Sequence, residues 1–227
     1  MTEIIPIRLT AVNVYLVKGQ RPILVDSGTS GSLPALLKAL SEHGVDPRDL
    51  SLLIQTHTHV DHAGSTHALQ EQYGVPVAVH AAESFDLAHG GKIPEDKPAS
   101  FFTRLITRLV PQGFSPAQPD VEVHATLDLR PYGVEGCAVH TPGHSPGSLT
   151  VIVDGCGAIA GDLLMGGNLV GLINPTRPNF PMIIDDKALL LASVRRVLDF
   201  APERIYIGHG GPFHCEDVAR WLERVSA

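Results

Sequence analysis

The stretch THTHVDH, at residues 56–62, places three histidines and one aspartate directly after the apolar run LSLLIQ, at residues 50–55. The apolar run has the length and composition of a buried strand. If the chain stays extended beyond it, His57 and His59 point to the same side, because side chains two residues apart share a face. Coordinating side chains are therefore expected to gather at the end of a predicted strand.

The same stretch continues with Asp61 and His62, where the chain turns towards a predicted helix. Neutral imidazole and carboxylate groups are ligands of zinc and of iron or manganese. Four such ligands within six residues do not fit comfortably around one tetrahedral ion, so the stretch indicates two adjacent metal ions. The alternative is a polar loop on a solvated surface, and the spacing after a buried strand makes it the weaker interpretation.

Three further motifs each place one candidate ligand after a predicted strand. They are TPGHSPGS with His144, AGDLL with Asp162 and IYIGHGG with His209. Prolines and glycines bend the chain at these positions and allow close backbone approach. Taken alone, the histidine of the first motif and the aspartate of the second could each be an ordinary turn residue. Together the motifs predict one site built at the ends of several strands.

The predicted strands come in two runs, each followed by helices. Strands are expected at residues 3–9, 13–19, 22–28, 50–56, 75–80, 121–129, 136–141, 148–155, 157–164 and 204–209, and helices at residues 32–44, 64–74, 185–200 and 215–227. Many of the strands are joined by short turns, which disfavours a parallel doubly wound sheet. The pattern predicts an α+β fold, a four-layer αββα sandwich with helices outside two stacked sheets.

Residues 84–119 differ from this pattern because they contain five prolines around one amphipathic segment, FFTRLITRLV at residues 101–110. We interpret them as an irregular, partly helical insert that forms a lid or a pocket wall. The sequence shows no linker that would separate two independent units. Residues 1–227 are therefore expected to form a single domain that carries this insert.

Composition narrows the class of partner. The net charge of −7 argues against a nucleic-acid-binding protein, which usually has a basic face. Residues 1–11, MTEIIPIRLTA, lack the cationic head and apolar core of a signal peptide, and no apolar run reaches the roughly 18 residues that cross a bilayer. The three cysteines are scattered. We expect a cytoplasmic protein with a small-molecule substrate and with neither nucleic acid nor membrane as a partner.

The four motifs, in this order and preceded by ILVDSG at residues 23–28, resemble those of the metallo-β-lactamase superfamily. The resemblance covers nearly the whole chain, and the motifs are specific in combination. It implies the αββα sandwich of that family, with metal ions at one edge between the two sheets.

The resemblance also implies which residues hold the metals. His57, His59 and His144 would bind the first ion, Asp61, His62 and His209 the second, and Asp162 would bridge the two. Asp26 matches the early aspartate of the family, and we expect it to support the ligands from behind. Its alternative is a turn residue at the end of a strand. Zinc is the favoured metal, with iron or manganese as alternatives.

Two divalent ions held in this way acidify a shared water, so that hydroxide exists near neutral pH and can attack an electrophilic carbonyl. Asp61 is placed to take or hand on a proton in addition to its ligand role. No serine or cysteine nucleophile is required, and no cysteine lies in a motif. The sequence therefore predicts a metal-dependent hydrolase of a small-molecule ester-type bond in a thioester, a lactone or a related compound.

The substrate stays open at this level. Family members of this length cleave thioesters such as hydroxyacyl-glutathione, lactones and β-lactams. Only a short helix is expected after His209, so the chain resembles a glyoxalase II-like branch without the C-terminal glutathione domain. Met165 stands where quorum-quenching lactonases have a tyrosine, three positions after Asp162.

Two alternatives keep the fold but change the function. Persulfide dioxygenases of the same superfamily use one iron, held by the equivalents of His57, His144 and Asp162. The GHGG sequence at His209 favours the hydrolytic branch instead. A non-catalytic binding scaffold is the lesser alternative, because degenerate relatives lose ligands and this chain keeps all seven.

Overall fold

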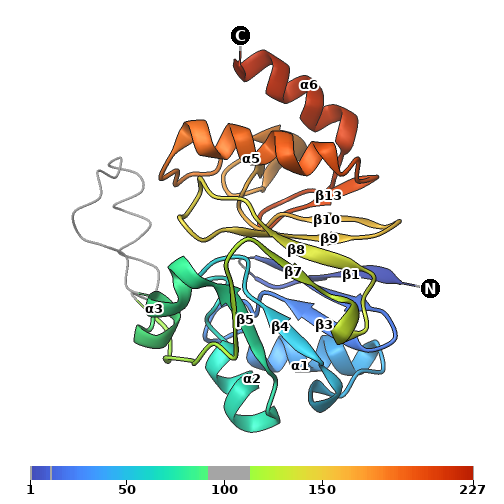
Figure 1. The fold of residues 1–227 in the computed structure, drawn as a ribbon, viewed down its shortest axis with the longest axis vertical. Coiled ribbons are helices and arrows are strands. Elements are labelled where there is room, and N and C mark those ends of the chain that lie inside the picture. The colour runs from blue at the N-terminus through green and yellow to red at the C-terminus, as the bar shows by residue number, and fades with distance from the viewer. Residues whose placement is uncertain (1, 11, 92–112, 227) are drawn as a thin grey trace.

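The computed structural model describes residues 2–10, 12–91 and 113–226. Its helices are α1 (Leu33–Glu42), α2 (Thr66–Tyr73), α3 (Ala81–His89), α5 (Lys187–Asp199) and α6 (Cys215–Ser226), with short 3₁₀ helices η1 (Pro47–Asp49) and η2 (Arg130–Tyr132). Two sheets are stacked between them, with α1 and α2 outside one sheet and α5 and α6 outside the other (Figure 1). The predicted four-layer αββα sandwich is confirmed.

The first sheet has six strands in the order in which they occur along the chain. They are β1 (Glu3–Arg8), β2 (Asn13–Lys18), β3 (Pro22–Val25), β4 (Leu52–Ile54), β5 (Val77–His80) and β6 (Val121–Val123). The first three strands form an antiparallel meander, and the last three add in parallel. Parallel pairing requires crossover connections, which contain α1, α2 and, between β5 and β6, α3.

The second sheet also has six strands, in the order β14-β13-β10-β9-β8-β7. Their bounds are β7 (Thr126–Asp128), β8 (Gly136–His140), β9 (Leu149–Val153), β10 (Gly157–Ile159), β13 (Arg204–Tyr206) and β14 (Phe213–His214). A separate antiparallel hairpin, β11 (Met165–Asn168) with β12 (Ile173–Asn179), leaves the sheet after β10.

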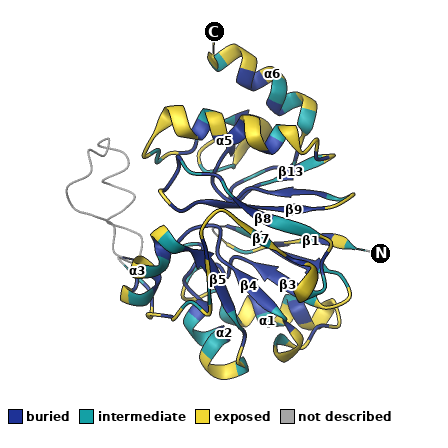
Figure 2. Cartoon of the chain, viewed as in Figure 1, coloured by how far each residue is buried: buried dark blue, intermediate teal, exposed yellow. Residues whose placement is uncertain are grey.

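The layers are held together by three apolar clusters, one between the sheets and one between each sheet and its helices. Strand β2 shows how a single strand contributes side chains to two of these clusters. Its alternate side chains point to opposite faces, so that Val14 and Leu16 join the cluster beneath the helices while Tyr15 and Val17 join the cluster between the sheets. Figure 2 shows the inner strands buried and the outward faces of the helices exposed.

One predicted strand is divided in the structure. Residues 121–129 form two short strands, β6 and β7, that belong to different sheets. Val121 pairs with Ala78 in the first sheet, whereas Thr126 pairs with Val139 in the second, so the chain crosses between sheets in this stretch. The alternating pattern continues through the crossing, because both strands expose one face, and periodicity alone does not reveal the change of sheet.

Two other regions differ from the sequence-based expectations. The β11–β12 hairpin was not predicted, since its glycines, asparagines and prolines have low strand propensity. The predicted insert at 84–119 begins inside a regular helix, α3, and its described remainder at 113–119 is irregular. Residues 92–112, including the predicted amphipathic segment, lie outside the described part of the chain.

Candidate metal centre

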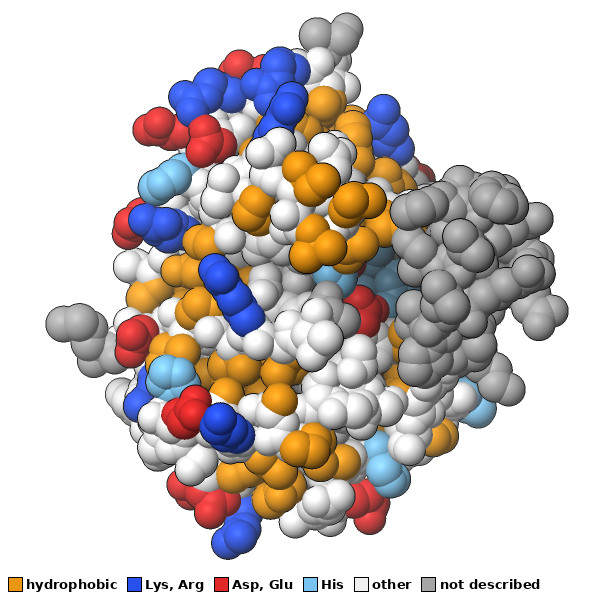
Figure 3. All heavy atoms as spheres, turned by 180° about the vertical axis from the view of Figure 1, so that it is seen from behind, with side chains coloured by type: hydrophobic (Ala, Val, Ile, Leu, Met, Phe, Trp, Pro, Cys, Tyr) orange, Lys and Arg blue, Asp and Glu red, His pale blue; other side chains and the backbone are white. Residues whose placement is uncertain are grey.

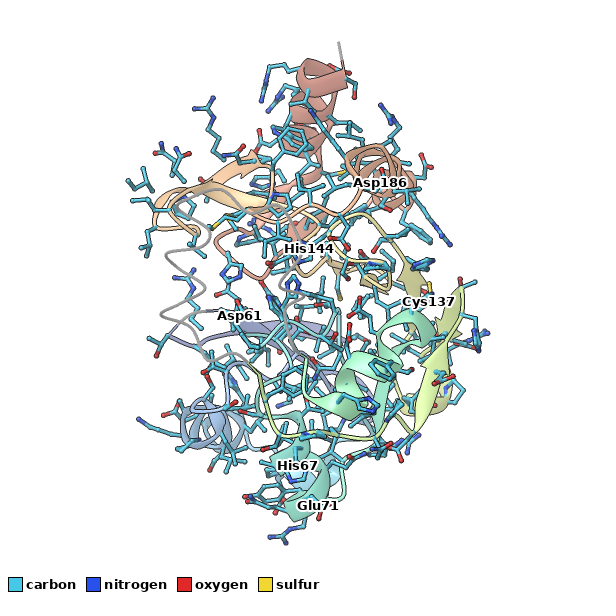
Figure 4. The ribbon with its side chains drawn as sticks, turned by 90° about the vertical axis from the view of Figure 1, so that its left-hand side faces the viewer. Asp61, His67, Glu71, Cys137, His144 and Asp186 are labelled. Carbon is cyan, nitrogen blue, oxygen red and sulfur yellow. The ribbon has the colours of Figure 1, made fainter. Side chains whose placement is uncertain are left out.

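All seven predicted ligands are brought together where loops from the two sheets meet. Four of them lie in the loop after β4 of the first sheet, and the others follow β8, β10 and β13 of the second sheet. Figure 4 shows Asp61 and His144 close to each other at the level between the two sheets. The site thus depends on the stacking of the sheets and not on either sheet alone.

The first half of the site is a triangle of three imidazole nitrogens. His57 Nε2, His59 Nδ1 and His144 Nε2 are each 3.1 Å from the other two. His57 and His144 are buried, and His59 is half-buried. Three nitrogens bound to one tetrahedral zinc ion at the usual length would be about 3.3 Å apart, so the spacing fits an ion of that size.

The protonation of these histidines also suits metal binding. His144 Nδ1 donates to the carbonyl of Ile183 at 2.8 Å, which leaves its Nε2 with a free lone pair towards the other two rings. Burial, reinforced by the neighbouring imidazoles, lowers the pKa of His57 well below its usual range. Burial likewise lowers the pKa of His144 to about 4. Neutral imidazoles are the form that binds a metal.

The second half of the site is built from Asp61, His62 and His209, whose donor atoms lie within 4.8 Å of one another. His209 Nε2 is 3.2 Å from Asp61 Oδ2. Burial alone would lower the pKa of His209, but Asp162 and Asp61 raise it to about 10. Asp162 and Asp26 likewise raise the pKa of His62 well above its usual range, against the effect of burial.

Asp162 lies between the two halves. Its Oδ1 is 3.3 Å from His62 Nε2, and its Oδ2 is 3.4 Å from His209 Nε2 and 4.0 Å from His144 Nε2. Burial would raise the pKa of this carboxyl, yet His209 and His62 hold it well below its usual range. The carboxylate therefore carries a negative charge that reaches both clusters.

Three buried atoms of the seven ligands lack a hydrogen-bond partner among the described residues. They are His62 Nε2, Asp162 Oδ1 and His209 Nδ1, and the first two lie 3.3 Å apart. Buried polar atoms are rarely left unpaired, and each such atom calls for an explanation. For His62 Nε2 and Asp162 Oδ1, a lone pair on each atom directed to a shared cation is that explanation, so these residues fit a divalent metal ion.

Asp26 stands directly behind the second half. It ends β3 in a left-handed conformation, with φ of 64°, and is buried. Its Oδ2 accepts a hydrogen bond from His62 Nδ1 at 2.8 Å, which orients the ring and frees Nε2 for a ligand. Its Oδ1 accepts from the backbone N–H of Thr56 at 2.8 Å, which fixes the start of the ligand loop.

Gly208 allows the segment after β13 to approach this cluster closely. A Cβ atom at this position would lie 2.3 Å from Asp162 Oδ1 and 2.6 Å from His62 Cε1, far inside van der Waals contact. The glycine in IYIGHGG is therefore a packing requirement of the site. Any larger residue would push β13 away from the two ligands.

The β11–β12 hairpin forms a rim beside His209. The N–H of Gly166 donates to the carbonyl of His209 at 2.8 Å, and the N–H of Gly211 donates to the carbonyl of Pro175 at 2.8 Å. The hairpin tip exposes apolar side chains, among them Leu172, which is 82% exposed. Figure 3 shows hydrophobic side chains gathered on this face next to histidine and acidic side chains.

Sequence reasoning missed three parts of this site. The hairpin sequence contains no strand signal. The sequence places Thr56 at the end of a strand but does not reveal its hydrogen bond to Asp26. Glu83, on α3, is a buried carboxylate in contact with the ligand loops. A glutamate three residues after a buried strand, at the start of a helix, would have been the only available signal, and it is common on solvated helices.

The comparisons with known proteins agree with this architecture. Residues 7–209 match the metallo-beta-lactamase superfamily. A probable metallo-hydrolase of Methanocaldococcus jannaschii is 29% identical, with 87% of each chain covered, and the probable metallo-hydrolase YqgX of Bacillus subtilis is 28% identical, with 90% of this chain and 88% of the relative covered.

Solved structures give the same result. TTHA1623 in a di-iron-bound form is 26% identical with a TM-score of 0.65, covering 95% of this chain and 97% of that one. The B3 metallo-beta-lactamase BLEG-1 has a TM-score of 0.71 over the full length of both chains, at 23% identity, and supports the fold alone.

The chain therefore belongs to the metallo-beta-lactamase superfamily. Its family, together with relatives described as probable metallo-hydrolases, makes it a hydrolase of the metallo-β-lactamase fold. The superfamily binds divalent metal ions, and the histidine and aspartate clusters of this chain are suited to hold them. Among the described residues, no helix combines the length and apolar character needed to cross a membrane.

Proposed function

We propose that this chain is a dinuclear metal hydrolase that cleaves an ester-type carbonyl bond in a small molecule. The observation that supports the proposal is that the seven donor side chains form two clusters of three residues, which a third group containing Asp162 links. A mononuclear site would need only one of these clusters. In the second cluster Asp61 Oδ2 lies 3.2 Å from His209 Nε2 and 3.9 Å from His62 Nε2, and Asp162 lies within 4.0 Å of both clusters.

The geometry supports the ligand roles that the resemblance implies. His57, His59 and His144 would hold one ion through the nitrogens that face one another. Asp61, His62 and His209 would hold the other, and Asp162 would bridge them, because its two oxygens face different partners. We propose zinc as the metal. The similar protein solved in a di-iron-bound form makes iron the alternative outcome.

Divalent ions, when bound, acidify water and polarise a carbonyl oxygen. The protein residues supply the proton transfer and the order around the reacting centre. Asp61 is the most exposed carboxylate of the set, with 26% of its side chain accessible. Although burial would raise its pKa, His62 and His209 hold the pKa of Asp61 below its usual range. Asp61 is thus ionised and reaches the solvent, and its position, not its lowered pKa, is the reason to propose that it accepts a proton from water and passes it on.

We also propose that residues 1–227 act as one domain. The ligand loop after β4 belongs to the first sheet, whereas His144, Asp162 and His209 follow strands of the second sheet. Neither sheet alone carries enough ligands for a bridged pair of ions. The stacked pair of sheets is therefore the smallest unit that can carry the activity.

The proposal is tested by metal analysis together with a substrate panel. The protein is purified without a metal-chelating tag, analysed for zinc, iron and manganese, and assayed with thioesters, lactones and β-lactams. We expect close to two metal ions per chain and hydrolysis of at least one class. A single iron held by His57, His144 and Asp162, with oxygen consumption and no hydrolysis, would replace the proposal with the dioxygenase.

A further inference from the structure

Glu83 is a buried carboxylate outside the predicted ligand set. It lies in the first turn of α3 and is only 3% exposed. A buried ionised carboxylate is costly unless its oxygens accept hydrogen bonds. Among the described residues, its hydrogen-bond donors are hydroxyl and backbone N–H groups. The negative charge of Glu83 at this buried position therefore calls for a structural explanation.

The two oxygens of Glu83 bind two different ligand loops. Oε2 accepts from the N–H of Thr58 at 3.1 Å and from the hydroxyl of the same residue. Oε1 accepts from Ser145 Oγ at 2.6 Å and from the N–H of Gly147 at 3.1 Å. Thr58 lies between the first two histidine ligands, and Ser145 follows the third directly.

This arrangement joins loops that come from opposite sheets. The loop of Thr58 follows β4 of the first sheet, and the loop of Ser145 follows β8 of the second. The three imidazole nitrogens are 3.1 Å apart only if these loops keep their separation. A rigid, planar carboxylate with one oxygen on each loop fixes that separation, because all four hydrogen bonds have to be satisfied together.

We propose that Glu83 is a positioning residue that sets the geometry and the metal affinity of the cluster formed by His57, His59 and His144. The inference rests on the metal site of the proposed function and adds to it a residue that touches neither metal nor substrate. Asp26 has the corresponding place behind the other cluster, where it orients His62. Each half of the centre thus has one buried carboxylate that holds it from outside.

The variant Glu83→Gln tests the inference with almost no change of volume. An amide keeps one oxygen and replaces the other with an NH2 group. Whichever way the amide turns, the N–H of Thr58 or that of Gly147 then faces another donor. The loops should move apart, and zinc affinity of the three-histidine cluster should fall by about 10- to 100-fold, the usual effect of losing such outer support.

The readouts are zinc affinity by competition with a chromophoric chelator and the visible spectrum of the cobalt-substituted protein. Circular dichroism and thermal unfolding check the fold. Glu71→Gln is the matched control, because Glu71 is exposed on α2 and Figure 4 places it far from His144. We expect weaker binding and a changed cobalt spectrum in Glu83→Gln only. A folded Glu83→Gln protein with the zinc affinity and cobalt spectrum of the wild type would overturn the inference.

Two milder variants decide the matter if Glu83→Gln does not fold. Thr58→Val and Ser145→Ala each remove one hydroxyl donor and leave the carboxylate in place. Each should weaken zinc binding several-fold, and unchanged binding in both would contradict the inference. If wild-type protein binds no metal at the three histidines, the proposed function itself fails. If the wild type binds and the variants bind equally, only the role of Glu83 fails.

Discussion

The two halves of the metal centre are equally buried but have opposite electrostatics. The three-histidine half contains imidazoles whose pKa values are lowered, that of His144 to about 4. In the other half the pKa of His209 is raised to about 10, and that of His62 well above its usual range. Burial acts in the same direction on all of them, so the neighbours decide the outcome.

The neighbours differ because of where the carboxylates lie. His57 faces other imidazoles. His209 faces Asp162 and Asp61, and His62 faces these two and Asp26. In the metal-free protein the first half is therefore neutral and already in the ligand form. The second half is a network of ion pairs that must release protons before a metal can bind. The two halves should respond differently to mutation and to pH.

The largest effect is expected from Asp162→Asn, because this residue belongs to both halves. The amide keeps the shape of the side chain but loses the charge and one ligand oxygen. We expect the metal content to fall from two ions to one per chain, with the three-histidine half still loaded, and the hydrolytic rate to fall by several orders of magnitude. Elemental analysis and steady-state kinetics measure both quantities.

Circular dichroism is the control for Asp162→Asn, since the residue lies in a loop outside the apolar clusters. A folded variant with full activity would mean that Asp162 does not join the two halves. Loss of both metals together would show that the two halves do not bind metal independently, and the contrast between them would not hold.

The stability of the metal-free protein should depend on pH in opposite ways for the two halves. The pKa of His144 is lowered to about 4, so its contribution is complete above pH about 6.5 and is lost as the pH falls to about 4. The loss corresponds to about 3 kcal/mol for this buried group. The pKa of His209 is raised to about 10, so its contribution is complete below pH about 6.5 and is lost as the pH rises to about 10.

Urea unfolding of chelator-treated protein from pH 4 to pH 10 measures this dependence. His144→Asn should flatten the acid side of the stability profile, and His209→Asn should flatten the alkaline side. Identical profiles for the wild type and both variants would show that these histidines do not control the pH dependence.

Asp26→Asn should weaken the second half more than the first, because Asp26 contacts His62 directly and reaches His57 only through Thr56. His62 Nδ1 would lose the carboxylate that accepts its proton, and the N–H of Thr56 would compete for the remaining oxygen. Loss of such a partner usually costs 10- to 100-fold in metal affinity, so we expect the second ion to bind about tenfold more weakly. Stepwise metal titration followed by calorimetry separates the two binding events. Equal weakening of both events would place Asp26 behind the whole centre.

The smallest effect is expected at the hairpin tip, which belongs to neither half. Leu172→Ser removes an exposed apolar side chain from the rim beside His209 and should leave metal content and stability unchanged. If the tip contacts an apolar part of the substrate, KM should rise about three- to tenfold at an unchanged kcat. Leu189→Ser, at an exposed position on α5, is the control. An unchanged KM would remove the hairpin from the substrate site.

The sequence by itself determined the chemistry and the layer order. Ligand types, their order and their positions after strands are local properties, and the unbroken apolar run VYLV of β2 is typical of a strand buried on both faces. Hence the αββα sandwich and the seven candidate ligands could be predicted. That these seven bind metal stays a prediction, although the structure brings them together.

Only the tertiary structure decided which atoms face one another. No local pattern tells that His59 presents Nδ1 while His57 and His144 present Nε2, that residues 121–129 change sheets, or that Glu83 spans two loops. The physical reason is that these contacts join residues distant in sequence. Their distances are set by how the two sheets stack, and the same side chains in another packing would carry no site.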